Sequence, residues 1–482
     1  MVRRLVPFTL ALLAACASAP RPAPEPYVRP APEPIAWPDD SRATQLQVLN
    51  RVAWGANRSS AADIARQGTG RWLDAQLHPS PAPLPAEMQA RIDAMTITQR
   101  PLAEVGAELE KRRRALRSAA PEERKQQLKV VNEELQSLAR ETQARMLLRA
   151  IYSPNQLEEH LSWFWLNHFN VFQYKGPLRA LVADYEERAI RPHALGRFRD
   201  LLGATARHPA MLIYLDNARN SAGRLNENYA RELMELHTLG VDGGYAQRDV
   251  ESLARVLTGW SIDLDAPGLA RFYPRRHDAS AKELLGRPIK AKGAAELDEA
   301  LDRLARHPST ARFVSRKLAV FFVADEPPSA LVERMAATFS ASDGDIAQVL
   351  RTMFASGEFR ASLGGKFKDP MHYALSALRL VLDERPLPDA QPVVGALARL
   401  GQPLYARATP DGYPLTKADW ASGGQLAARF EIARAIGYRI PARIWDEPLG
   451  PLSASTREAL ARAATAEEWN QLLLSSPEFM QR

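Results

Sequence analysis

The segment from Asn226 to Gly240 combines carboxylates, an imidazole and a guanidinium, the groups that bind metal ions or move protons. His237 projects to nearly the opposite side of this helix from Glu235, at about 100° per residue. Glu232, Glu235 and His237 therefore cannot be three ligands of one metal ion from this helix alone. A single helical arc instead holds four polar side chains, namely Asn228, Arg231, Glu232 and Glu235.

Two interpretations of this polar arc stay open. In the first, Arg231 pairs with Glu227 and Glu235 at i,i+4 spacing, and the arc is a solvated ion-pair face. In the second, the arc is a functional cluster in which Glu232 and Glu235 are metal ligands or a general base. Arg231 would then orient an anionic substrate group, and Asn228 would contact the substrate.

The segment from His160 to Phe169 is rich in aromatic residues and holds two imidazoles and an amide. His160 and His168 lie about 12 Å apart along a helix, too far to bind one metal ion. The simpler interpretation is a buried aromatic helix whose polar groups are hydrogen-bonded. The functional alternative makes His168 a metal ligand and assigns substrate contacts, including ring stacking on sugars, to Trp163, Trp165, Asn167 and His168.

A third polar segment follows Trp260, where a loop holds His277, Asp278 and Lys282. A His beside an Asp can ligate a metal or act as a base with an orienting carboxylate. Structural His-Asp neighbours are also common, so both interpretations stay open. In the functional one, His277 and Asp278 are catalytic, and Trp260 and Lys282 contact substrate. The candidate ligands of a divalent metal are then Glu232, Glu235, His168 and His277.

The elements that must position these side chains are helices, because helical periodicity runs through most of the sequence. We predict a mainly α, multi-helical globular domain over residues 45–482, long enough to divide into two helical subdomains, with few short strands. Residues 102–148 form a projecting helical hairpin, 150–290 hold the polar motifs, and 291–482 form a C-terminal helical part. We also expect one helix over 62–77 and a short β-hairpin near Arg271–Tyr273.

The amino terminus predicts export and lipidation. Arg3 and Arg4 precede a short apolar run, and Cys16 follows small residues, which indicates a lipoprotein signal over residues 1–15. An ordinary signal peptide with an incidental cysteine is the alternative. Residues 16–44 comprise the lipidated Cys16 and a proline-rich stalk with a reach of about 60 Å. Ala17 after the cysteine resembles the sorting pattern for the periplasmic face of the outer membrane.

Composition excludes several function classes. The net charge of +7 is small for 482 residues, and export removes nucleic acid as the obvious partner. Cys16 is the only cysteine, so the mature body has no disulfide, no thiol nucleophile and no cysteine-ligated metal. The sequence contains no serine-hydrolase elbow, phosphate loop or dinucleotide fingerprint.

Several motifs together resemble the signature of the bacterial "domain of unknown function 1800" family, over roughly Gln45 to the C-terminus. They include residues 226–240, Asn167-His168-Phe169, Thr258-Gly259-Trp260, His277-Asp278 with Lys282, Lys317-Leu318, Gly244-Tyr245, Gly412-Tyr413-Pro414 and Trp420. Leu166 departs from the pattern, which often has a polar residue there. The resemblance implies an exported, mainly helical protein without an assigned reaction. Such proteins often accompany a second exported family related to sulfatases and phosphatases.

Two classes of function remain open. The first is a membrane-anchored envelope lipoprotein that binds or assembles a partner, either the co-exported sulfatase- and phosphatase-related protein or an envelope glycan. The second is a metal-assisted or acid–base hydrolase of an envelope polymer, with Glu232, Glu235, His277 and Asp278 in catalytic roles. A divalent metal is the expected cofactor of the metal-assisted form of this second class. Its geometric requirement is a carboxylate of Glu232 or Glu235 beside His168 or His277 in an open cleft.

Overall fold

Helices dominate the described part of the chain, which contains 24 α-helices and two small antiparallel sheets, so the predicted mainly α class is confirmed. The computed structural model describes residues 34–264, 266, 268–438, 440–445 and 452–482. Cys16, the predicted signal and most of the predicted stalk lie outside the described residues. None of the described helices is both long enough and apolar enough to span a membrane. Residues Ile35–Arg482 form one compact unit rather than two subdomains.

The body begins before its first helix, because Ile35 is already buried. The single helix predicted over 62–77 is in fact two helices, which meet at Gly68. The φ of +80° at Gly68 ends one helix and begins the next, a conformation that glycine adopts readily. The N-terminal helices are α1 (Arg42–Val52), α2 (Arg58–Gln67), α3 (Thr69–Leu77), α4 (Ala86–Asp93) and α5 (Thr96–Gln99).

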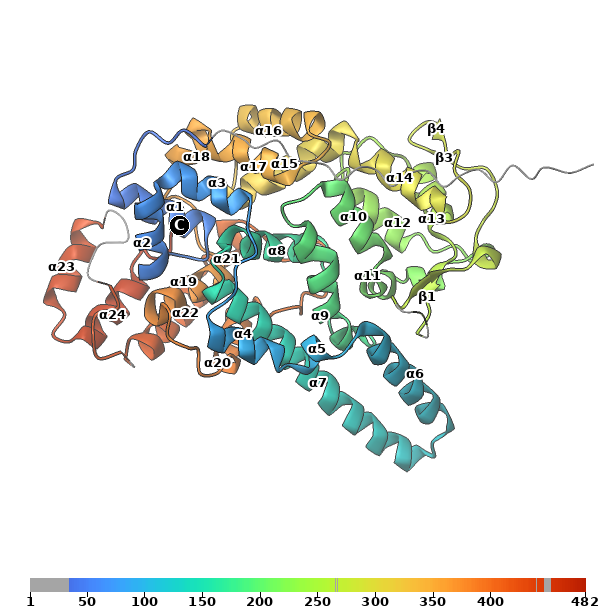
Figure 1. Cartoon of the computed structure of the whole chain (residues 1–482), viewed down its shortest axis with the longest axis horizontal. Helices are drawn as coiled ribbons and strands as arrows, with labels where there is room; N and C mark the ends of the chain where they lie inside the picture. The colour runs from blue at the N-terminus through green and yellow to red at the C-terminus, as the bar shows by residue number, and fades with distance from the viewer. Residues whose placement is uncertain (1–33, 265, 267, 439, 446–451) are drawn as a thin grey trace, which may run out of the picture. The chain divides into compact units, whose positions relative to one another are not determined.

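The predicted helical hairpin is present and consists of α6 (Leu102–Ser118) and α7 (Pro121–Tyr152). Its free end extends away from the other helices of the body (Figure 1). Pro121 suits the first position of α7, where its missing N–H would have no helical partner. Only the inner part of the hairpin seam packs, since Leu135 and Leu138 are buried whereas Leu128 is 42% exposed. The outer half of α7 is therefore open to solvent.

At the centre of the body lies α8 (Gln156–His168), in which every side chain except that of Glu158 is buried. Its aromatic and its polar side chains are buried alike, as the simpler interpretation of the aromatic segment requires. The elements that follow it are η1 (Leu178–Ala180), α9 (Val182–Asp184), η2 (Tyr185–Ile190), η3 (Arg191–His193), α10 (Phe198–Arg207), α11 (Pro209–Tyr214), η4 (Asn217–Arg219), α12 (Asn228–Glu235) and α13 (Gln247–Leu257).

Two small antiparallel sheets follow α13. Strand β1 (Trp260–Ile262) pairs with β2 (Ala270–Phe272), with Ser261 opposite Arg271, so the short hairpin predicted near Arg271 is confirmed. The 3₁₀ turn η5 (Pro274–Arg276) leads from β2 to His277. Strands β3 (Glu283–Leu284) and β4 (Arg287–Pro288) form the second sheet.

The C-terminal helices complete one continuous core that reaches from Ile35 to Met480. They are α14 (Ala295–Ala305), α15 (Pro308–Phe322), α16 (Ser329–Ala341), α17 (Ile346–Phe354), α18 (Gly357–Ser362), α19 (Pro370–Leu382), α20 (Gln391–Arg399), α21 (Lys417–Trp420), α22 (Gly423–Gly437), α23 (Ala454–Arg462) and α24 (Ala466–Ser475).

The residues after α24 return to the middle of the core, beside α1. Lys368 N–H donates to the carbonyl of Met480, and Arg482 N–H donates to that of Lys366, both at 2.8 Å. The guanidinium of Arg51 in α1 is fully buried and donates to the carbonyl oxygens of Arg482 and Phe322, both at 2.6 Å. Segments from both ends of the body therefore meet in one buried polar junction.

Candidate functional site

The polar arc of residues 228–235 lies on α12, at a half-buried edge of the body. Tyr229 and Leu233 point into the core and are buried, whereas Arg231, Glu232 and Glu235 are partly exposed. This division follows from the spacing of apolar residues on one helical stripe. The arc is therefore neither closed into the core nor fully solvated.

Two residues of the arc have local structural partners. The guanidinium of Arg231 lies 3.1 Å from Glu227 Oε2 and 3.0 Å from Gln247 Oε1, so the predicted pairing with Glu227 is confirmed. The side-chain amide of Asn228 donates to the carbonyl of Leu215 at 3.2 Å. Arg231 and Asn228 thus fix α12 to its surroundings.

Glu232 and Glu235 face further ionisable groups. Burial, followed by the negative charge of Glu235, raises the pKa of Glu232, and Asp411 acts in the same direction. Burial and the charge of Glu235 also raise the pKa of Tyr245. Three carboxylates and a phenol therefore share this edge, and the negative charges among them raise the pKa of Glu232 and of Tyr245.

Beneath the arc, His168 connects Lys317 in α15 to the turn after α12. Lys317 Nζ donates to His168 Nδ1 at 2.9 Å, so the ring proton of His168 is on Nε2, which donates to the carbonyl of His237 at 3.1 Å. Burial lowers the pKa of Lys317 to about 8, although Asp411 opposes this shift. Burial and the nearby Lys317 charge lower the pKa of His237 to about 3. His237 is 1% exposed, and both its ring nitrogens lack a hydrogen-bond partner among the described residues.

The loop that carries Asp411 is held by the end of α8. Asn167 Oδ1 accepts from Tyr413 N–H at 2.6 Å, and its amide nitrogen donates to the Tyr413 carbonyl at 2.8 Å. Gly412 has a φ of +77°, and a Cβ there would lie 2.8 Å from Asn167 Oδ1. Trp163 stacks on the ring of Tyr413 and is buried. Trp163 and Asn167 thus position the loop from within the core.

His277, Lys282 and Glu296 form a separate buried cluster. His277 Nε2 lies 3.2 Å and Lys282 Nζ 2.7 Å from the carboxylate of Glu296, and all three side chains are at most 5% exposed. The carboxylate facing His277 is thus that of Glu296 and not that of Asp278. Asp278 pairs instead with Arg255 at 3.0 Å. Burial opposes ionisation of Asp278, but the hydrogen bonds from Arg255 and Ser280 prevail and lower its pKa.

The remaining sequence candidates are two tryptophans. Trp165 is fully buried, and its indole N–H donates to the Ala194 carbonyl at 2.9 Å, so its ring is part of the core. Trp260 is half-buried between Phe272 and the guanidinium of Arg207. The structure brings together no three His, Cys, Asp or Glu side chains that could hold a metal ion, as far as the chain is described. Glu232, Glu235, His168 and His277 therefore do not form one ligand set there.

The chain is similar to a known protein family over most of its length. The model of a family described as "Protein of unknown function (DUF1800)" matches residues 47–481. The chain belongs to this family. No curated protein and no solved structure matches it. The DUF1800 match includes the polar arc, the buried His168 and Lys317, and the loop with Asp411.

Sequence reasoning missed Lys317 and Asp411 as members of the DUF1800 polar site. Both lie far from α12 along the chain, and only the fold brings them to Glu232. A usable signal was present, because Lys317-Leu318 and Gly412-Tyr413-Pro414 belong to the motifs that resemble the family.

Proposed function

We propose that this DUF1800 protein is exported, is held at the membrane by a lipidated Cys16, and binds an anionic envelope glycan along α7. The observation that supports it is a shallow groove of about 590 Å³ on the outer half of α7. Its basic side chains are Lys125, Lys129, Arg140 and Arg179.

The groove suits an extended chain better than a compact ligand. Lys125 and Arg140 are about 22 Å apart at 1.5 Å per helical residue. Basic groups spaced along one line can pair with successive carboxylates or phosphates of a polymer. Asn132 and Gln136 add amide donors, and Leu128 offers exposed apolar surface to a sugar ring. Glu133 is the only carboxylate lining this groove, in the part of the chain that the structure describes.

Reversing two positive charges in the groove should weaken binding strongly. For the double variant Lys125→Glu with Lys129→Glu, we expect at least tenfold weaker binding to polygalacturonate, a polyanionic sugar polymer, because two attractive contacts become repulsive. Affinity is measured by co-sedimentation at several salt concentrations, with neutral dextran and anionic lipid vesicles as alternative ligands.

The matched control carries the same charge change elsewhere. Arg66 and Arg462 are exposed side chains outside the hairpin, so Arg66→Glu with Arg462→Glu should bind within twofold of the unmodified protein. Equal losses of affinity in both double variants would show that binding depends only on net charge, and would refute the groove as the binding site. Tighter binding to vesicles than to the polymer would replace the glycan with a lipid surface.

Anchoring is tested at the other end of the chain. Cys16→Ser should prevent lipidation, because the thiol is the acceptor of the acyl group. Cell fractionation should then find the protein unprocessed or released from membranes. Unchanged processing and unchanged membrane attachment would contradict the lipoprotein proposal.

The hydrolase alternative has less support from the described residues. The hydrogen-bond and ion-pair partners of His168 are Lys317 and the His237 carbonyl, and those of His277 are Thr258 and Glu296. Neither imidazole is thus paired with Glu232 or Glu235, as the acid–base arrangement would require. Binding is therefore the function that we propose.

A further inference from the structure

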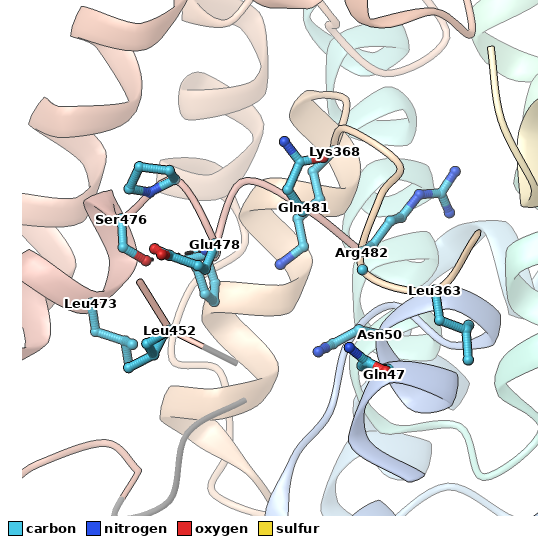
Figure 2. Close-up of a pocket in the computed structure, with 13 residues that line it drawn as sticks. Gln47, Asn50, Leu363, Lys368, Leu452, Leu473, Ser476, Glu478, Gln481 and Arg482 are labelled. Atoms are coloured by element: carbon cyan, nitrogen blue, oxygen red, sulfur yellow. Dashed lines mark hydrogen bonds between the residues drawn. The ribbon is translucent and has the colours of Figure 1, made fainter. Parts of the chain in front are cut away.

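A second cavity, of about 340 Å³, lies between α1, Lys368 in the segment before α19 and the segment after α24 (Figure 2). Its volume is at the lower end of the range for small-molecule sites. Polar groups of Gln47, Asn50 and Gln481 line it together with Lys368, and Leu473 and Phe479 add apolar surface. None of these residues belongs to the α7 groove or to the polar arc.

Lys368 is the unusual residue of this cavity. It is 2% exposed, and its amine has no hydrogen-bond or ion-pair partner within the described ranges of the chain. The amine lies over the ring of Phe479, 3.9 Å from the ring centroid. A buried cation without a partner is costly, because the surrounding protein does not replace the water that it has lost.

The charges around Lys368 increase that cost. Burial lowers the pKa of Lys368 well below its usual value, and the positive charges of Arg429 and Arg482 act in the same direction. The neighbouring carboxylates are engaged elsewhere. Asp369 faces His372 at 2.9 Å, and Glu478 accepts from Ser453 N–H at 2.8 Å. Neither of these two carboxylates is thus paired with the Lys368 amine within the described residues.

We propose that this cavity binds a small anion whose carboxylate or phosphate group pairs with the Lys368 amine. The side-chain amides of Asn50 and Gln481 are hydrogen-bonding groups within the same lining. Leu473 and Phe479 would contact the carbon skeleton of the ligand. The anion would supply the charge that the buried cation lacks.

The test titrates full-length protein with sodium phosphate, glycerol 3-phosphate or succinate, at constant ionic strength against chloride. We expect at least one of them to bind saturably by calorimetry and to raise the thermal unfolding midpoint. Lys368→Met should weaken that binding at least tenfold, whereas Lys368→Arg should keep part of it. The anion that binds decides between a phosphate and a carboxylate ligand.

Two controls keep the proposal open to refutation. Lys290→Met removes one exposed lysine outside the cavity and should bind the anion as the unmodified protein does. Lys368→Met should unfold at the same or a higher temperature without added anion, because it removes an unpartnered buried amine. If no anion binds, or if the Lys368→Met and Lys290→Met proteins bind equally well, the proposal is wrong.

Discussion

Acidification from pH 7 to pH 5 is expected to remove most of the stability of the helical body. Four of its imidazoles are at most 2% exposed. Burial lowers the pKa of His237 to about 3 and of His372 to about 4, and it lowers the pKa of both His160 and His168 well below the usual value. The rings of His237 and His372 are therefore largely neutral in the folded protein at pH 5, and the pKa values of His160 and His168 are shifted in the same direction.

The direction of this change in stability follows from the difference in proton binding between the unfolded and the folded state. In the unfolded chain an imidazole has its ordinary pKa of about 6.5, so below that pH the unfolded state binds protons that the folded state excludes. The contribution of each buried neutral imidazole to the free energy of unfolding is fully present above pH 6.5. It is lost as the pH falls towards the pKa of that imidazole in the folded protein. Each ring costs about 1.4 kcal/mol per pH unit, or about 2 kcal/mol at pH 5. His237 and His372 together account for about 4 kcal/mol at pH 5, and His160 and His168 act in the same direction, against a typical domain stability of about 5–15 kcal/mol.

Urea unfolding followed by circular dichroism at pH 7, 6 and 5 measures this loss. His237→Leu offers a clean test, because both ring nitrogens of His237 lack hydrogen-bond partners and no bond is broken. The number of protons taken up on unfolding, given by the slope of the free energy of unfolding against pH, should fall by about one in this variant. His193→Leu, at a half-buried ring, should change the slope less. A free energy of unfolding that is constant from pH 7 to 5 would show that these rings are accessible to protons.

The second large effect is expected from Gly412→Ala, at a loss of about 3 kcal/mol or more in the free energy of unfolding. The φ of +77° disfavours any side chain, and the new Cβ would press on the backbone carbonyl and the amide of Asn167. Because Asn167 also holds Tyr413, the loop must shift, and Asp411 moves away from Glu232. The pKa of Glu232, measured by NMR, should then fall.

Gly244→Ala is the matched control for this prediction. Its φ of +80° is nearly the same, but a Cβ there meets nothing within 4 Å. Gly244→Ala should therefore lower the free energy of unfolding only by the cost of a positive φ in a residue with a Cβ, about 1–2 kcal/mol. If the two variants lose equal stability, the close packing of Gly412 against α8 contributes nothing.

The helical class and most helix positions could be predicted from the sequence, because apolar residues recur at helical spacing. The break at Gly68 was missed, since the apolar periodicity continues across it and only the positive φ separates α2 from α3. The 42% exposure of Leu128 in α7 could not be predicted either. Regular spacing of apolar residues shows which side chains can pack, but not how closely the partner helix approaches them.

Contacts between distant segments could not be predicted in the same way. The Lys317–His168 hydrogen bond and the approach of Asp411 to Glu232 depend on how α8, α12 and α15 pack, which no local pattern records. The neighbour of His277 was misjudged because adjacency in sequence suggested Asp278, whereas an extended backbone turns successive side chains apart and Glu296 takes the place. The charges and types of the site residues were visible, but their partners were not.

The hydrogen bond from Arg51 to the carbonyl of Arg482 also has a consequence for when and how fast the protein can fold. It joins residues 431 positions apart, so the core cannot be completed until nearly all of the body has been synthesised. Chains with such distant contacts fold slowly, because a long loop must close before the contact is rewarded. We propose that this protein is exported, and slow folding would suit export. The chain would stay unfolded while it passes through a translocation channel and would fold after it has crossed the membrane.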